Sequence, residues 1–324
     1  MDIKRRDFLK VVAGSGLLLA AGESPAGAIA RPPRTMPDEA VGLMYDSTIC
    51  VGCKVCQKAC KVSNNMPPEH TQRPPEMIDA LWDNPADLSE YTLNIIKAYK
   101  NGNAEVKNRE DNGFAFIQRH CMHCVDPACV SACPVSALQK NPKTGVVTYS
   151  KNACIGCRYC QMACPFGIPK FEWDKAFPQI RKCQFCDHKF AEGGYPACAQ
   201  SCPTGATIFG PARDLLAEAK KRLTLKADSY YDYPVQRIDS GNRVKQKVAS
   251  YVTRVYGEKE VGGTQFIMLA GVPFGRLGLP DLGDRPDAAL SEGIQHTLYK
   301  GMIAPAAVLA GLMYAAYRST KNDK

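Results

Sequence analysis

The sequence predicts an α+β protein in which short strands, cysteine-rich loops and short helices alternate, with one further helix at the C-terminus. Three observations lead to this prediction. The chain has 16 cysteines, which fall into four groups with related spacing. Strand-like stretches precede three of these groups and follow the fourth. An uncharged apolar run lies near the C-terminus.

The composition is typical of a chain that buries a core. The 324 residues are 45% hydrophobic and 23% charged, which excludes a disordered tail protein and a collagen-like fibre and allows one to three domains. The net charge of +9 is mild for this length, and the two Trp and 14 Tyr form no aromatic ladder for stacking bases. The composition therefore does not indicate nucleic-acid binding.

The first 30 residues are predicted to be an export signal. Arg5 and Arg6 precede Phe8, an apolar run follows over residues 11–21, and small residues at 26–30 fit a cleavage site. The paired arginines are similar to those of twin-arginine signals, which export proteins already folded around a cofactor. The alternative is a basic amphipathic helix or a membrane anchor, for which the apolar run is short.

Every cysteine belongs to a group of four that are close in sequence. The groups are Cys50, Cys53, Cys56 and Cys60; Cys121, Cys124, Cys129 and Cys133; Cys154, Cys157, Cys160 and Cys164; and Cys183, Cys186, Cys198 and Cys202. The first and third have the spacing C-x2-C-x2-C-x3-C, and the others differ only in a longer middle spacer. A proline directly follows the last three groups, whereas Lys61 follows the first.

This is the spacing with which bacterial ferredoxins hold [4Fe–4S] clusters. Three close thiolates bind three irons of one cubane from a single loop, and the fourth reaches the other cluster of a pair. Small residues such as Gly52, Gly156 and Ala163 let backbone N–H groups approach the sulfurs. The sequence therefore predicts four [4Fe–4S] clusters, with all 16 cysteines as ligands and no catalytic residue.

Three other uses of cysteine are less favoured. Disulfides suit an exported protein, but closely spaced C-x2-C-x2-C cysteines cannot all pair locally. A zinc site needs neither the third close cysteine nor the proline. Haem attachment needs C-x-x-C-H, which is absent. We expect His123, between Cys121 and Cys124, to be a spacer facing solvent, although an influence on a cluster's potential is the alternative.

The remaining elements follow from periodicity and turn residues. Strands are predicted over residues 42–49, 114–119, 145–149, 206–209 and 264–269, and helices near 93–100 and over 214–223. We expect residues 230–242 to be irregular because they are polar.

The C-terminal apolar run covers residues 301–317 and contains no charged residue. Its length is at the lower limit for a membrane-spanning helix, and Arg318 and Lys321 follow it. We predict a transmembrane helix over 299–318 with the last residues in the cytoplasm. The alternative is a helix buried in a soluble core.

Several segments outside the cysteines add a likeness to a known family. They are residues 43–53, 121–127, 256–260 and 294–302. With the cysteine pattern, they make the chain resemble the four-cluster electron-transfer subunits of bacterial respiratory enzymes, above all the iron–sulfur subunit of the hydrogenase-2 type of nickel–iron hydrogenase. Relatives serve formate dehydrogenases, dimethyl-sulfoxide reductases and nitrite reductases.

The resemblance implies a grouping of ligands across the chain and a nested domain arrangement. The implied ligand sets are Cys50, Cys53, Cys56 with Cys202; Cys183, Cys186, Cys198 with Cys60; Cys121, Cys124, Cys129 with Cys164; and Cys154, Cys157, Cys160 with Cys133. A first ferredoxin-like 2[4Fe–4S] unit would cover 41–119 and 181–215, and a second, inserted in it, 120–180. An extension packed on this core would cover 216–295.

The resemblance also implies a function. The chain would be a partner of the small and large subunits of a periplasm-facing nickel–iron hydrogenase. It would take the electrons that leave the small subunit and relay them to an integral-membrane quinone-reducing subunit. It would sit at the periplasmic side of the bacterial inner membrane, anchored by the C-terminal helix. The first alternative is the same relay in a formate dehydrogenase or molybdenum reductase. The second is a structural scaffold stabilised by zinc.

Overall fold

A computed structural model of the chain describes residues 30–67 and 85–321. The described chain divides into two compact units, one of residues 33–288 and one of residues 30–32 with 289–321. The predicted export signal over 1–30 lies, except for its last residue, outside the described residues. The elements named below up to β13 belong to the larger unit.

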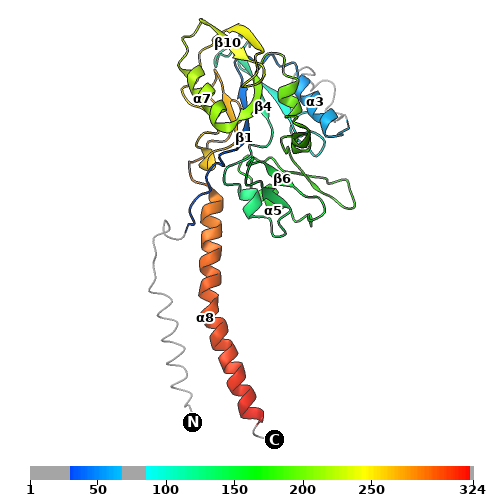
Figure 1. Cartoon of the computed structure of the whole chain (residues 1–324), viewed down its shortest axis with the longest axis vertical. Helices are drawn as coiled ribbons and strands as arrows, with labels where there is room; N and C mark the ends of the chain where they lie inside the picture. The colour runs from blue at the N-terminus through cyan, green and yellow to red at the C-terminus, as the bar shows by residue number, and fades with distance from the viewer. Residues whose placement is uncertain (1–29, 68–84, 322–324) are drawn as a thin grey trace. The chain divides into compact units, whose positions relative to one another are not determined.

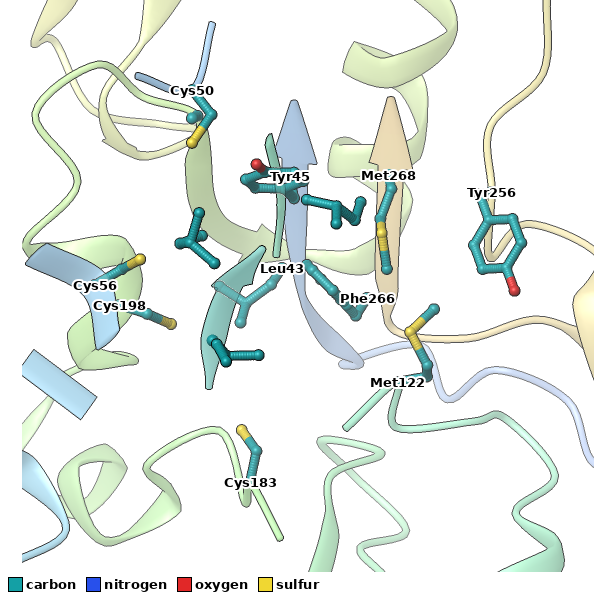
Figure 2. Close-up of a cluster of buried hydrophobic side chains, with 14 of the residues drawn as sticks. Leu43, Tyr45, Cys50, Cys56, Met122, Cys183, Cys198, Tyr256, Phe266 and Met268 are labelled. Carbon is teal, nitrogen blue, oxygen red and sulfur yellow. The ribbon is translucent and has the colours of Figure 1, made fainter. Parts of the chain in front are cut away.

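The larger unit is built around a four-stranded sheet with β1 inside it (Figure 1). The strand order is β11–β9–β1–β13, and the strands span Gln236–Arg237, Thr207–Pro211, Val41–Asp46 and Phe266–Leu269. β1 runs antiparallel to β9 and parallel to β13. Because Leu43, Met44 and Tyr45 are fully buried in turn, β1 is covered on both faces. Figure 2 shows Leu43, Tyr45, Phe266 and Met268 gathered in this core.

Three strands predicted from the sequence surround the cysteine loops as expected. β1, β9 and β13 lie within or close to the predicted stretches, and α7 (Ala212–Leu223) confirms the predicted helix over 214–223. The helix packs through Leu215 and Ala219 against a core that includes Met44. Its buried Arg222 pairs with Asp46 at the end of β1, with 2.9 Å between Nη1 and Oδ2.

The helix predicted near residues 93–100 is wrong. These residues form β2 (Ile95–Lys100), which pairs antiparallel with β4 (Gly113–Arg119), and the short β3 (Val106–Lys107) completes this sheet. Ile95 and Ile96 are β-branched, which favours a strand, and both are buried. The expectation for 230–242 is also wrong in part, because β10 (Tyr230–Pro234) pairs with β12 (Arg243–Lys247).

The residues between β4 and β9 form short hairpins and helices. The hairpins are β5 (Leu138–Lys140) with β6 (Val147–Tyr149) and β7 (Lys170–Phe171) with β8 (Ile180–Arg181). The helices of this region are α4 (Ala128–Ser131), α5 (Tyr159–Ala163), η2 (Asp187–Glu192) and α6 (Ala197–Gln200). Two further helices lie outside it: α3 (Val55–Ser63) precedes the region and η3 (Glu260–Gly262) follows it. A small core of Leu138, Val147, Phe171 and Ile180 joins the two hairpins. Each of α3, α4, α5 and α6 carries cysteines.

The C-terminal helix α8 (Asp287–Lys321) extends well before the predicted start at 299. Within the described residues, however, no helix has a stretch long and apolar enough to cross a membrane. The apolar run is short, and Gly301, Pro305 and Gly311 contribute little apolar surface to it. The predicted transmembrane helix over 299–318 is therefore wrong, and so is the predicted anchoring at the periplasmic side of the inner membrane by this helix.

Candidate iron–sulfur sites

The first cysteine loop is shaped by left-handed backbone between β1 and α3. Gly52 has a φ of 69° and its N–H donates to Cys50 Sγ at 3.4 Å. Lys54 has a φ of 57°, after which α3 begins at Val55. The turn thus presents sulfurs and a backbone N–H to one side, as predicted for Gly52. The loop after Cys154 repeats this geometry, since the Gly156 N–H donates to Cys154 Sγ at 3.4 Å.

The cysteines of the first loop share a cavity with a cysteine distant in sequence. Cys50, Cys53, Cys56 and Cys202 line this cavity. Burial raises the pKa of the Cys50 thiol to about 11, although the hydrogen bond from the Gly52 N–H acts to lower it. The Thr207 N–H donates to Cys202 Sγ at 3.4 Å. Because β9 pairs with β1, it brings Cys202 back to the first loop.

A second group lies on the opposite end of α3. Cys60, one turn beyond Cys56, is close to Cys186, and burial followed by the Cys186 charge raises the pKa of its thiol to about 12. The pKa of Cys198 is raised by burial and then by the charges of Cys183, Cys60 and Cys186. All four thiols are buried. Asn64 Nδ2 lies 3.7 Å from Cys60 Sγ and 3.9 Å from Cys186 Sγ, and so joins the two halves of the group.

The third and fourth groups have the same form. Cys124 and Cys164 pack against the core that contains Cys121. Burial, and then the charges of Cys121, Cys129 and Cys164, raise the pKa of Cys124, which is consistent with the implied grouping. The fourth cavity is lined by Cys133, Cys154, Cys157 and Cys160. The Ala137 N–H donates to Cys133 Sγ at 3.1 Å. In each of the four groups, three cysteines come from one loop region and the fourth from another.

The four groups follow one another through the larger unit. Cys56 contributes to the raised pKa of Cys198, Cys121 to that of Cys183, and Cys160 to that of Cys129, in each case after burial. These mutual charge effects indicate a succession from the Cys50 group through the Cys183 and Cys121 groups to the Cys154 group. Figure 2 shows Cys56 and Cys198 side by side at the first of these junctions.

The donor sets fit [4Fe–4S] clusters. Each group offers four thiols, and backbone N–H groups donate to sulfurs in at least three of them. Such N–H donors offset the negative charge of a cluster. Burial disfavours the bare thiolates, so a cation has to accompany them, as bound iron does. Among residues 30–67 and 85–321, no three His, Cys, Asp or Glu side chains are placed to hold a single metal ion.

We expected His123 to face solvent, and this expectation is wrong. Its side chain is fully buried and stacks on Phe185 with ring centroids 3.7 Å apart. Its Nδ1 accepts a hydrogen bond from the Val147 N–H at 3.0 Å. Burial lowers the pKa of His123. Burial also lowers the pKa of the neighbouring His120, to about 4. The spacing of the cysteines gave no signal for this packing, because Phe185 belongs to a loop about 60 residues away.

Models of the 4Fe-4S dicluster domain match residues 43–134 and 113–212. The hydrogenase-2 operon protein HybA of Escherichia coli O157:H7 is 48% identical over 327 residues, which cover 99% of this chain and 97% of that protein. This chain belongs to the HybA family of 4Fe–4S dicluster proteins. It is an iron–sulfur electron-transfer subunit of the hydrogenase type and contains [4Fe–4S] clusters.

More distant relatives serve other enzymes. The iron–sulfur subunit of the nitrate-inducible formate dehydrogenase of Escherichia coli K12 is 35% identical over 205 residues, 61% of this chain and 65% of that subunit. The probable anaerobic dimethyl sulfoxide reductase chain YnfG of the same strain is 36% identical over 181 residues, 54% of this chain and 75% of that protein. The likeness over the full length is to the hydrogenase-2 protein, which agrees with the family expected from the sequence.

Proposed function

We propose that this chain relays electrons, through four [4Fe–4S] clusters held by its 16 cysteines, from the small and large subunits of a nickel–iron hydrogenase to an integral-membrane quinone-reducing partner. The observation that carries the proposal is that two separate cavities are each lined by four cysteines drawn from two loop regions, with the other eight cysteines in the same compact unit. When bound, each cluster supplies a site that accepts and gives up one electron. The chain binds no substrate of its own.

The protein's own residues have three roles in this proposal. The ligand sets are Cys50, Cys53, Cys56 and Cys202; Cys60, Cys183, Cys186 and Cys198; Cys121, Cys124, Cys129 and Cys164; and Cys133, Cys154, Cys157 and Cys160. Backbone N–H groups such as that of Phe185, 3.4 Å from Cys183 Sγ, tune the potentials. Apolar side chains such as Ile96 beside the first cavity and Leu138 beside the fourth exclude water.

A cysteine variant in the native complex tests the relay. Cys157 lines the fourth cavity, at one end of the succession. In a Cys157→Ala variant, hydrogen oxidation coupled to quinone is expected to fall, while the catalytic subunits still reduce a soluble dye. Normal quinone-linked activity in this variant would refute the relay.

A second candidate keeps the relay but changes the electron donor. The identity to the formate dehydrogenase iron–sulfur subunit favours it, although that likeness covers 61% of the chain. Metal analysis of the purified complex separates the two. Nickel that co-purifies with the chain supports the hydrogenase, whereas molybdenum supports a formate dehydrogenase or a molybdenum reductase.

A further inference from the structure

Lys182 is buried at the junction between the two middle cysteine groups. Only 4% of its surface is exposed. Its Nζ donates to the Cys183 carbonyl at 3.1 Å, and Cys183 belongs to the second group. Its Nζ also donates to the carbonyl of Val147, whose N–H donates to Nδ1 of His123 in the third group's loop at 3.0 Å. Its charge lowers the pKa of Cys129 in that group, against the larger effect of burial. Lys182 therefore contacts the second group and acts electrostatically on the third.

The ammonium of Lys182 has no carboxylate partner within the described parts of the chain. Its hydrogen bonds go to two backbone carbonyls, those of Val147 and Cys183. Other buried charges of the larger unit are paired: Arg222 with Asp46, and Glu172 with Lys175 and Arg181. Burying an ammonium without a counter-charge is costly, and lysine is rarely buried unless it is paired.

The same junction is buried and closely packed. The His123 ring, from the third group's loop, stacks on Phe185, from the second group's loop. The ammonium lies beside this stack, because it donates to the carbonyl of Val147, and the N–H of the same residue donates to His123 Nδ1 at 3.0 Å. Burial of these side chains reduces the screening of the charge by solvent, and the negative groups close to it are the thiolates of the two middle groups.

We propose that the Lys182 ammonium is the shared counter-charge of the two middle clusters, and that it raises their reduction potentials above those of the two outer clusters. A fixed positive charge stabilises the reduced, more negative form of a nearby cluster more than the oxidised form. Lys182 is thus a positioning residue for the electron rather than a ligand. The inference rests on cluster binding by the proposed ligands, but not on the identity of the electron donor.

Three variants of the full chain separate the charge of Lys182 from its shape. Lys182→Gln keeps N–H donors for the two carbonyls and removes the charge, Lys182→Met removes both, and Lys182→Arg keeps the charge. Lys151→Met is the matched control, because Lys151 is exposed and precedes the outer Cys154 group. The readouts are iron per chain and midpoint potentials from anaerobic redox titration followed by electron paramagnetic resonance.

In Lys182→Gln and Lys182→Met, we expect two of the four clusters to become at least tenfold harder to reduce at a fixed potential, which is about 59 mV for a one-electron couple. In the same two variants, the ease of reduction of the other two clusters should change by less than threefold. In Lys182→Arg and Lys151→Met, it should change by less than threefold for all four clusters. Loss of iron from both neutral variants, with full iron in Lys182→Arg, would likewise support a need for charge.

Two results would overturn the inference. One is a neutral variant that binds full iron and whose four midpoint potentials are either all unchanged or all shifted by the same amount. The other is loss of iron from all three Lys182 variants, because the requirement would then be for shape. The unsubstituted chain is measured in parallel. If it binds no iron, the proposed ligands fail instead, so the two failures are distinguishable.

Discussion

Gly52 and Gly156 offer a matched test of how the cysteine loops are built. Each lies two residues after the first cysteine of its group. Their φ angles are 69° and 70°, and each N–H donates to the sulfur of that cysteine at 3.4 Å. An alanine at either position should therefore suffer the same backbone strain, about 1–2 kcal/mol for an L-residue in the left-handed region.

The two sites differ in the space beside the glycine. A Cβ at position 52 would lie 2.4 Å from Cε1 and 2.6 Å from Cζ of Phe116, whereas at position 156 the nearest atom is Cε2 of Phe171 at 3.6 Å. Phe116 is 3% exposed and packs edge-on against Phe114, so its ring has little room to move. Overpacking of this kind costs a further 1–3 kcal/mol or so. Gly52→Ala should therefore cost about 2–5 kcal/mol, and Gly156→Ala about 1–2 kcal/mol.

The assay is anaerobic unfolding of both variants in guanidinium chloride, followed by the visible absorbance of the clusters, with iron per chain measured beforehand. We expect Gly52→Ala to unfold at a clearly lower denaturant concentration than Gly156→Ala and to lose iron first. Equal losses in the two variants, or a larger loss in Gly156→Ala, would refute the steric reasoning.

Three further predictions concern the ligand grouping and the packing of β1. Because Cys202 shares a cavity with Cys53, Cys202→Ala and Cys53→Ala should each remove the same cluster, so that the double variant holds no less iron than either single variant; an additive loss of iron would contradict this grouping. Arg222→Leu leaves the buried Asp46 without its ion-pair partner and should cost about 3–5 kcal/mol in unfolding free energy. Asp46→Asn in the same chain should recover part of that loss, and a cost below 1 kcal/mol or so in the single variant would argue against the pair. Tyr45→Phe removes the hydroxyl that donates to the Phe116 carbonyl at 2.9 Å and should cost about 0.5–1.5 kcal/mol without loss of iron; a variant that loses a cluster would contradict this expectation.

The sequence could predict the cysteine loops because their chemistry is local. The spacing of Cys50, Cys53 and Cys56 reflects what one loop needs to reach several irons, and a glycine between them has to adopt positive φ. The strands beside these loops were also predictable, because β1 and β9 are short apolar runs next to turns. The grouping of Cys60 with Cys186 depends on the path of the chain, and only the resemblance to a family implied it.

Where the predictions failed, tertiary contacts decided the outcome. Residues 95–100 have an ambiguous local preference, and they form a strand because β4 pairs with them. His123 is polar and flanked by cysteines, yet Phe185 and Val147 enclose it. The apolar run in α8 is uncharged, but small residues and Pro305 leave it short of the hydropathy that a span needs. The burial of Lys182 was missed because lysine is usually exposed, although Ile180 two residues before it and Cys183 directly after it are both buried.

The proposed function requires that the 16 cysteines of this chain hold four [4Fe–4S] clusters. Quantitative iron and acid-labile sulfide analysis of the anaerobically purified chain, with Mössbauer spectroscopy of the same sample, tests it most directly. Four clusters correspond to about 16 iron and 16 sulfide per chain, all in cubane clusters. Zinc without acid-labile sulfide, or iron for only two clusters in a fully folded chain, would contradict it.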